Sequence, residues 1–381
     1  MAVNSLERYL PKIGVRFELA EGFSDSIRLR KPETRDIVER IGVIPPYHVF
    51  LNNFPLRNPA AVFNPALFIN HKEEYVRIYA RIIVGYYKYV SAITDIQVPL
   101  KDVLESTISS NYYASTIVIY PSSKYDRWGA EDPRLYEIDG TIYMTYVGRT
   151  VNYFNPIAQR ERTLPITAIY KGNDTWDKRI VHKPPKSYAD FTISDKDAYL
   201  FKAHGRLWLF HRPHIEVNGQ DFFMLLISRL EPLLLEKAKK ANKILEVEST
   251  KPVMVTAATH FESKVGWATP PIKLSDRKLI ALVHGVDAEL VSYRVFAIEL
   301  ELPRSEDENV VVTAVTPQYI MAPQRNYEVF GDMPGVIFPT GLWSLEKDKY
   351  LIAYGAADFM IGLGLIDLNT LLGELDKGRI F

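Results

Sequence analysis

The sequence predicts an all-β fold, and within that class a five-bladed β-propeller. Short runs rich in Val, Ile, Tyr and Phe alternate with Gly, Asp and Pro over most of the 381 residues, a pattern typical of successive β-strands. A local repeat is the second observation: a tight polar turn followed by a strongly apolar strand occurs five times. The five turns are 65 to 72 residues apart and lie at His71, Asp139, His204, Asp276 and Lys347. A period of this length holds four strands with their loops, and five such units in a ring would leave no long open edge.

Two segments carry a helical pattern. Residues 231–246 combine Pro232, which suits the first turn of a helix, with a Lys-rich face that suits solvent. The C-terminal segment begins at Asp367, a capping residue, and ends at Gly378, which favours a helix stop. Residues 1–44 precede the first repeat and are predicted as an N-terminal extension, so that the propeller domain spans residues 45–381.

The composition disfavours several classes of function. With 46 Lys and Arg against 46 Asp and Glu the formal net charge is zero, which disfavours nucleic-acid partners and confines anion recognition to a local site. The lack of Cys excludes disulfides and thiolate chemistry and fits a reducing compartment, so we expect a cytoplasmic protein. No stretch approaches the ~18 apolar residues of a membrane span, and we expect neither secretion nor a membrane partner. Motifs of P-loop proteins, serine hydrolases and dinucleotide-binding folds are also missing.

The strand that enters each turn carries polar residues at its far end. In a hairpin, residues equally far before and after the turn lie side by side at the open end. If the five hairpins are blades of one ring, these polar ends gather at one mouth of its central channel. The expected neighbours are Asn64 with Arg81, Asp132 with Arg149, Asp197 with His211 and Arg212, Thr269 with His284, and Thr340 with Asp358.

One of these strand ends carries two opposite charges around a proline. Pro133 marks the end or edge of a strand, because it has no N–H to donate to a ladder. Asp132 and Arg134 are two residues apart and project to the same face of an extended strand. A single carboxylate beside a guanidinium is most often a structural ion pair. Because other charged residues are expected at the ends of the neighbouring strands, Asp132 is nevertheless a candidate catalytic residue.

Three basic residues, Arg212, Lys264 and His284, come from three successive repeats and have no acidic partner in their own motifs. Burying them together is costly unless an anion is bound, and phosphate would accept charge-assisted hydrogen bonds from all three. Taken singly, His284 is better explained as a satisfied strand-end histidine and Lys264 as an ordinary solvated lysine, but taken together these residues favour an anion site. A metal site is not predicted, because His211 and His214 lie on an extended strand and a Pro turn rather than on one helix face.

Several ordered motifs extend from about Asn64 to the C-terminus. They are GAEDPRLYEIDGTIYMTY at 129–146, KDAYLFKAHGRLWLFHRP at 196–213, KVGWATPPIKLSDRKLIALVHGV at 264–286, FPTG at 338–341 and YGAAD at 354–358. In these motifs the chain resembles glycoside hydrolase family 130, the inverting β-mannoside phosphorylases and related β-mannosidases, which are five-bladed β-propellers. The S-x-D-G segment that this family often carries before EDPR is missing here, which leaves the contacts to the acceptor sugar open.

The resemblance implies a reaction and a role for each matching residue. The reaction is β-mannoside plus phosphate to α-mannose 1-phosphate plus a shortened acceptor, with inorganic phosphate as co-substrate and no other cofactor. Asp132 matches the general acid, which in this family passes its proton through a hydroxyl of the bound mannosyl ring. The phosphate-binding positions fall on Arg212, Lys264 and His284, and the sugar-binding positions on Asn64, Lys196, Asp197 and Asp358. Arg134 is expected to orient a neighbouring residue or to contact the sugar as part of the substrate-binding set.

Two other functions stay open at this point. An inverting hydrolase needs a second carboxylate to activate water, whereas phosphate is already nucleophilic and needs only to be positioned. A retained basic cluster therefore favours a phosphorylase over the first alternative, an inverting β-mannosidase that uses water. The second alternative is a non-catalytic propeller that binds glycans. Residues 1–44 and 231–246 lie outside the motifs. By the resemblance, such extensions often form oligomer contacts or acceptor subsites, so a homo-oligomer is a possible partner state.

Overall fold

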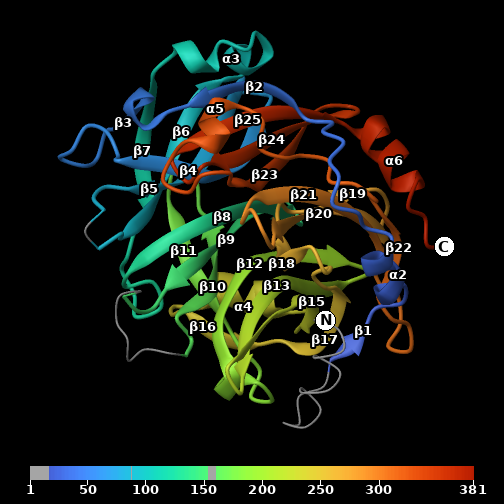
Figure 1. The fold of residues 1–381 in the computed structure, drawn as a ribbon. Coiled ribbons are helices and arrows are strands. Elements are labelled where there is room, and N and C mark those ends of the chain that lie inside the picture. Colours follow the sequence, from blue (N-terminus) through green and yellow to red (C-terminus); the bar gives the residue numbers. More distant parts are fainter. Residues whose placement is uncertain (1–16, 87, 153–159) are drawn as a thin grey trace.

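The computed structural model describes residues 17–86, 88–152 and 160–381 of the chain. Strands dominate it and helices are few and short, which confirms the predicted all-β class (Figure 1). The strands pair in four sheets that are mostly antiparallel, and none of the four closes on itself within the described residues.

The largest sheet has ten strands and consists of two consecutive meanders. A single parallel pair, Ser91 with Gly129, joins the two. The first meander contains β4 (Ala61–Asn70), β5 (Tyr75–Ile83), β6 (Ser91–Pro99) and β7 (Tyr113–Ile119), with β3 (Val49–Leu51) parallel to β7. The second contains β8 (Gly129–Ile138), β9 (Thr141–Arg149), β10 (Thr163–Tyr170) and β11 (Trp176–Lys183), with β16 (Leu245–Glu248) parallel to β11.

The other three sheets are also built around antiparallel hairpins. One contains β12 (Thr192–Ala203), β13 (Arg206–Val217), β14 (Gln220–Phe223), β15 (Leu225–Leu230), β17 (Thr250–Thr256) and β1 (Glu18–Leu19). The next contains β18 (Glu262–Trp267), β19 (Ile272–Lys273), β20 (Lys278–Asp287), β21 (Tyr293–Glu301) and β22 (Val311–Val315). The last contains β23 (Ile337–Glu346), β24 (Lys349–Ala356), β25 (Met360–Asp367) and β2 (Glu39–Ile44).

Short helices lie between the strands. They are α2 (Phe23–Arg28), α3 (Leu100–Leu104), α4 (Leu234–Lys240), α5 (Asn326–Val329) and α6 (Leu368–Asp376), with single 3₁₀ turns η2 (Pro46–His48), η3 (Ile108–Ser110) and η4 (Ala189–Phe191).

The helix predictions are confirmed at the C-terminus and only in part at the insert. Asp367 caps α6, because its Oδ1 accepts the backbone N–H of Thr370 at 2.7 Å. The predicted helix over residues 231–246 is confined to α4, and its last residues form strand β16 instead. Pairing with β11 gives that segment the backbone hydrogen bonds that a longer helix would have supplied.

Part of the predicted N-terminal extension belongs to a sheet. Strand β2 lies within residues 1–44 and pairs antiparallel with β25 near the other end of the chain, as Figure 1 shows. Gly364 of β25 approaches this strand so closely that a Cβ there would lie 2.8 Å from the backbone oxygen of Glu39. The sequence of the extension alone gives no sign of this long-range pairing.

All five predicted turns connect paired strands. Two of them are two-residue turns in which both residues have positive φ: Asp139 with Gly140, and His204 with Gly205. Such turns match the right-handed twist of the flanking strands. The strands that enter the turns also contact one another, since β4 lies against β8 and β23, and β12 lies against β8 and β18.

The predicted register at the open ends of the hairpins is wrong by one to three residues. A β-bulge in each of three entering strands, where two residues face one on the partner strand, accounts for one residue of the difference. A further register shift lies beside Thr340, which does not pair with Asp358. The observed pairs are Phe63 with Arg81, Gly129 with Arg149, Lys196 with Arg212 and Gly266 with His284.

A buried aromatic cluster fixes the sheet of β12 and β13 against the sheet of β18. Phe210 stacks on Tyr199 at 4.8 Å between ring centroids and meets the edge of Trp267 at 5.0 Å. The indole N–H of Trp267 donates to the backbone oxygen of Leu226 at 3.1 Å, which satisfies its polar atom inside the core. Aromatic contacts of this kind hold β12, β13 and β18 in place, the strands that carry the polar residues described next.

Candidate functional site

A cavity of about 170 Å³ collects the polar ends of the hairpins. Eight of the nine predicted site residues line it: Asn64, Asp132, Lys196, Asp197, Arg212, Lys264, His284 and Asp358. Five residues that were not predicted as site residues complete the lining: Arg81, Tyr293, Met333, Val336 and Phe338. The predicted gathering of strand ends from different repeats at one place is therefore observed.

Three of these residues share an unusual backbone conformation. Asn64, Asp132 and Asp197 have φ values of 48°, 48° and 53° and begin the three β-bulges of the entering strands. Asn and Asp are the non-glycine residues that adopt this left-handed conformation most readily. A bulge re-aims a side chain, and here it turns each polar group into the cavity.

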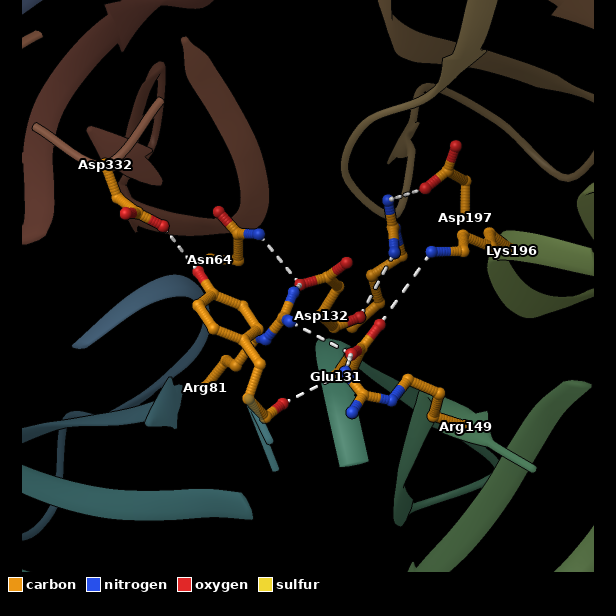
Figure 2. Close-up of polar contacts among 10 residues, drawn as sticks. Asn64, Arg81, Glu131, Asp132, Arg149, Lys196, Asp197 and Asp332 are labelled. Carbon is orange, nitrogen blue, oxygen red and sulfur yellow. Dashed lines mark hydrogen bonds and ion pairs between the residues drawn. The ribbon is translucent and has the colours of Figure 1, made fainter. Parts of the chain in front are cut away.

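Asp132 is held by two donors that bind the same oxygen. Its Oδ1 accepts Nδ2 of Asn64 at 2.7 Å and Nη1 of Arg81 at 3.1 Å (Figure 2). Arg81 also donates to Oε1 of Glu131 at 2.9 Å, and Arg149 reaches the same oxygen at 3.3 Å. Although Arg149 does not pair with Asp132 as predicted, it fixes the neighbouring residue. The carboxylate of Asp132 is 7% exposed and has a defined orientation.

Asp197 corrects the prediction that the basic cluster has no acidic partner. Its carboxylate binds the guanidinium groups of Arg212 and Arg134, and its Oδ2 lies 3.7 Å from Nε2 of His284. Burial alone would raise the pKa of Asp197, but the charges of these basic neighbours outweigh it and hold that pKa well below its usual range. Asp197 belongs to the same β12–β13 hairpin as Arg212, and the bulge brings the two together. Two arginines and Lys264 still exceed this single carboxylate by two positive charges.

Burial lowers the pKa of the other two basic residues of the cluster, Lys264 and His284. Burial, with the neighbouring Arg212 charge, lowers the pKa of Lys264 to about 8. Burial also lowers the pKa of His284 to about 3, so the imidazole is neutral near pH 7. Neither ring nitrogen of His284 has a hydrogen-bond partner within the described part of the chain. Both groups would gain from a hydrogen-bonding anion in the cavity.

Arg134 lies behind the cavity rather than in its wall. Its side chain is fully buried and donates to the backbone oxygens of Ala268 and Trp267 at 2.6 and 2.8 Å, in addition to its ion pair with Asp197. Arg134 was predicted to orient a neighbour or to contact the sugar, and the side chain has no exposed surface in this structure. It ties β8 to the segment after β18 and orients Asp197.

Asp358 follows β24 and has a perturbed acidity. Burial raises the pKa of Asp358 to about 7, and the negative charges of Asp132, Asp332 and Glu131 add to the effect, while Arg81 opposes it. The carboxyl group is therefore partly protonated near neutral pH. A carboxyl group in that state can either donate to or accept from a hydroxyl group.

Within residues 17–86, 88–152 and 160–381, no three His, Asp or Glu side chains converge as ligands for one metal ion. In the same part of the chain, every helix is too short or too polar to cross a membrane.

Residues 28–377 match the family model of glycoside hydrolase family 130, described as beta-1,4-mannooligosaccharide phosphorylase. The chain belongs to glycoside hydrolase family 130. This assignment confirms the resemblance that the motifs predicted and makes the chain a member of an enzyme family.

Relatives of this family 130 member support the assignment. The beta-1,2-mannobiose phosphorylase of Thermoanaerobacter sp. strain X514 is 29% identical over 251 residues, which are 64% of this chain and 68% of that protein. The 1,2-beta-oligomannan phosphorylase of the same organism is 28% identical over 247 residues, 64% of this chain and 70% of that protein. The solved structure of a β-1,2-mannobiose phosphorylase from Listeria innocua has a TM-score of 0.66 at 16% identity and covers 89% of this chain and 99% of that one. The structural likeness establishes a shared fold.

The family 130 cavity contains residues that the sequence analysis did not select. Arg81 was expected only as a neighbour of Asn64, yet it binds both Asp132 and Glu131. Its place at the polar end of the first repeated strand was the available signal. Tyr293 begins β21 and Met333 lies between α5 and β23. Both are outside the repeated pattern, and nothing in their local sequence indicated the cavity.

Proposed function

We propose that the protein catalyses inverting phosphorolysis of β-mannosides, which yields α-mannose 1-phosphate and a shortened acceptor. The observation that carries this proposal is the positive wall of the cavity, where Arg212 and Lys264 lie beside the neutral His284. The single carboxylate of this wall, Asp197, leaves a positive surplus. Phosphate would accept hydrogen bonds from all three groups and compensate that charge.

The same wall gives phosphate its role as nucleophile. A hydrolase of inverting type requires a second carboxylate, placed apart from the acid, to activate water. Phosphate attacks the anomeric carbon without such a base once it is bound and oriented. The basic wall therefore replaces a general base in this proposal, and inorganic phosphate is a co-substrate rather than a cofactor.

Asp132 is the proposed general acid. Asn64 and Arg81 both occupy Oδ1, so the proton would be carried on Oδ2 and passed through a hydroxyl of the mannosyl ring to the leaving oxygen. In the synthetic direction the same carboxylate would take a proton back from the acceptor hydroxyl. Lys196, Asp197 and Asp358 complete the proposed sugar pocket, with Asp358 able to bind a hydroxyl in either protonation state.

The proposed linkage is β-1,2. Both of the curated relatives described above carry names that refer to β-1,2-linked mannose, although the family description refers to β-1,4-linked substrates. The proposed substrate is accordingly β-1,2-mannobiose or a longer β-1,2-linked manno-oligosaccharide.

A five-bladed ring is the architecture that we propose for the four observed sheets. In support, the ten-stranded sheet divides at the Ser91–Gly129 pair into two four-stranded meanders, and the entering strands of neighbouring units contact one another. Strand β2 would then complete the last blade beside β25 and close the ring between the two ends of the chain. The division at residue 44, the cytoplasmic location and the homo-oligomer remain predictions.

Product analysis tests the function directly. The protein is incubated with β-1,2-mannobiose, with and without inorganic phosphate, and the sugars are identified. α-Mannose 1-phosphate formed only with phosphate supports phosphorolysis. Free mannose as sole product in both buffers would instead identify a β-mannosidase, and binding without any product would identify a glycan-binding protein.

A further inference from the structure

Two loops from different sheets meet beside the cavity. Tyr89 lies between β5 and β6, and its hydroxyl donates to Oδ2 of Asp332 at 2.8 Å. Asp332 lies between α5 and β23 and precedes Met333, which lines the cavity. This hydrogen bond joins the first and last sheets over a span of 243 residues in the chain.

The surrounding residues fix Tyr89 in an unfavourable backbone conformation. Its φ is 54°, which is uncommon for a residue with a bulky side chain. Its backbone oxygen accepts Nη1 of the buried Arg149 at 3.0 Å. The ring lies 5.6 Å from the guanidinium carbon of Arg81, whose other aromatic neighbour is Phe63 at 4.9 Å. Because these contacts hold Tyr89 in a strained conformation, we infer that the fixed position of its ring has a functional role.

The pair lies on the side of Asp132 away from the phosphate wall. Figure 2 shows Asp332 and Asp197 on opposite sides of Asp132. In an inverting displacement the nucleophile and the leaving group occupy opposite faces of the anomeric carbon. If phosphate binds near Asp197 and Arg212, the departing sugar must lie towards Tyr89 and Asp332.

The chemistry of this region fits a sugar. Tyr86 is 45% exposed and its ring centroid lies 5.9 Å from that of Tyr89, so a second aromatic ring lies beside the Tyr89–Asp332 pair. Met333 is also 45% exposed. Apolar ring faces beside the carboxylate of Asp332 offer a neutral, hydroxyl-rich ligand both a stacking surface and a hydrogen-bond acceptor.

We propose that Tyr89 and Asp332 form the binding subsite for the leaving-group sugar, the acceptor of the reverse reaction. This inference rests on the proposed function and names the acceptor contacts that the missing S-x-D-G segment left open. Tyr89 supplies the surface on which the acceptor ring lies. Asp332 accepts hydrogen bonds from the hydroxyl groups of the acceptor and, through its hydrogen bond with Tyr89, keeps that ring in place.

The reverse reaction separates this subsite from the rest of the cavity. Phosphate release from α-mannose 1-phosphate is measured with mannose as acceptor, and KM is determined for each substrate. We expect Tyr89→Ala and Asp332→Ala to raise the KM for mannose about tenfold, equal to about 1.4 kcal/mol, and to change the KM for α-mannose 1-phosphate less than about twofold. Tyr89→Phe keeps the ring and loses only the hydroxyl, so its effect is smaller.

The matched control is Tyr75→Ala, at a 41% exposed tyrosine at the other end of β5, which should leave both KM values unchanged. No phosphate release from the unaltered protein would refute the proposed function itself. An active protein whose Tyr89 and Asp332 variants keep the mannose KM would refute the subsite alone. An equal rise in both KM values would place the two residues in the donor site and overturn the inference as well.

Discussion

Gly266 pairs with His284 across β18 and β20, and the imidazole of His284 occupies the space that a side chain at residue 266 would need. A Cβ on Gly266 would lie 2.4 Å from Cε1 of His284 and 2.5 Å from Oδ2 of Asp197. These distances are shorter than any normal contact. The glycine of the KVGW motif is therefore required by close approach, and it allows two polar groups of the cavity to meet.

Gly266→Ala should accordingly damage the proposed phosphate site. The added methyl group displaces His284 and Asp197, and we expect the KM for phosphate to rise about tenfold. Overpacking should also cost about 1–3 kcal/mol of the free energy of unfolding. Steady-state kinetics and urea denaturation measure the two effects.

The control for this substitution is Gly373→Ala in α6, where an added Cβ meets nothing within 4 Å. Alanine favours a helix, so that variant should keep its activity and be at least as stable. An unchanged KM for phosphate in Gly266→Ala would show that His284 does not contact the anion.

The parts of the site that could be predicted are those that follow from turn residues close by in the sequence. Asp139–Gly140 and His204–Gly205 indicate tight turns, and equal spacing then places Asp132 and Asp197 at the far ends of their hairpins. The bulges could not be counted in this way, because one extra residue leaves no mark in the hydrophobic pattern. Asp197 was expected beside Arg212, but the ion pair between their side chains was not, because the bulge conformation decides where the carboxylate points.

Contacts between distant segments escaped prediction for a different reason. Strand β2 pairs with β25, and Tyr89 binds Asp332, across more than two hundred residues. The sequences around β2, Tyr89 and Asp332 contain no repeat or charged motif that would indicate which distant segment each one contacts. Only the packing of the first sheet against the last brings them together.

Asp132→Asn tests the general acid. The amide can no longer deliver a proton, so we expect kcat with β-1,2-mannobiose and phosphate to fall by about 10²–10⁴-fold. The matched control is Asp139→Asn, the same substitution at the turn of the same hairpin, where Asn tolerates the φ of 50°. The initial rate of α-mannose 1-phosphate formation is the measurement. A variant at Asp132 with unaltered kcat would assign proton transfer to another group.

Phosphate binding should weaken as the pH rises. Burial sets the pKa of Lys264 to about 8, so above that value the wall loses one cation and the KM for phosphate should increase. Lys264→Arg keeps its charge at these pH values and should abolish the increase. Measuring the KM for phosphate at about pH 7 and about pH 9 in both proteins checks the expectation. The same increase in both would exclude Lys264 as its source.

The stability of the protein should depend on Asp358 in a defined pH interval. Burial raises the pKa of Asp358 from 3.8 to about 7 in the folded protein. Between these values the folded state keeps the proton that the unfolded chain has lost, so this group makes the free energy of unfolding decrease as the pH rises from about 4 to about 7. Asp358→Asn removes the titration. Relative to the unaltered protein, the variant should therefore gain more than about 1 kcal/mol on going from about pH 4 to about pH 8 in urea denaturation. Asp348→Asn, in the turn of the β23–β24 hairpin, should show no such gain. A constant difference between Asp358→Asn and the unaltered protein at both pH values would mean that burial does not favour the neutral carboxyl group.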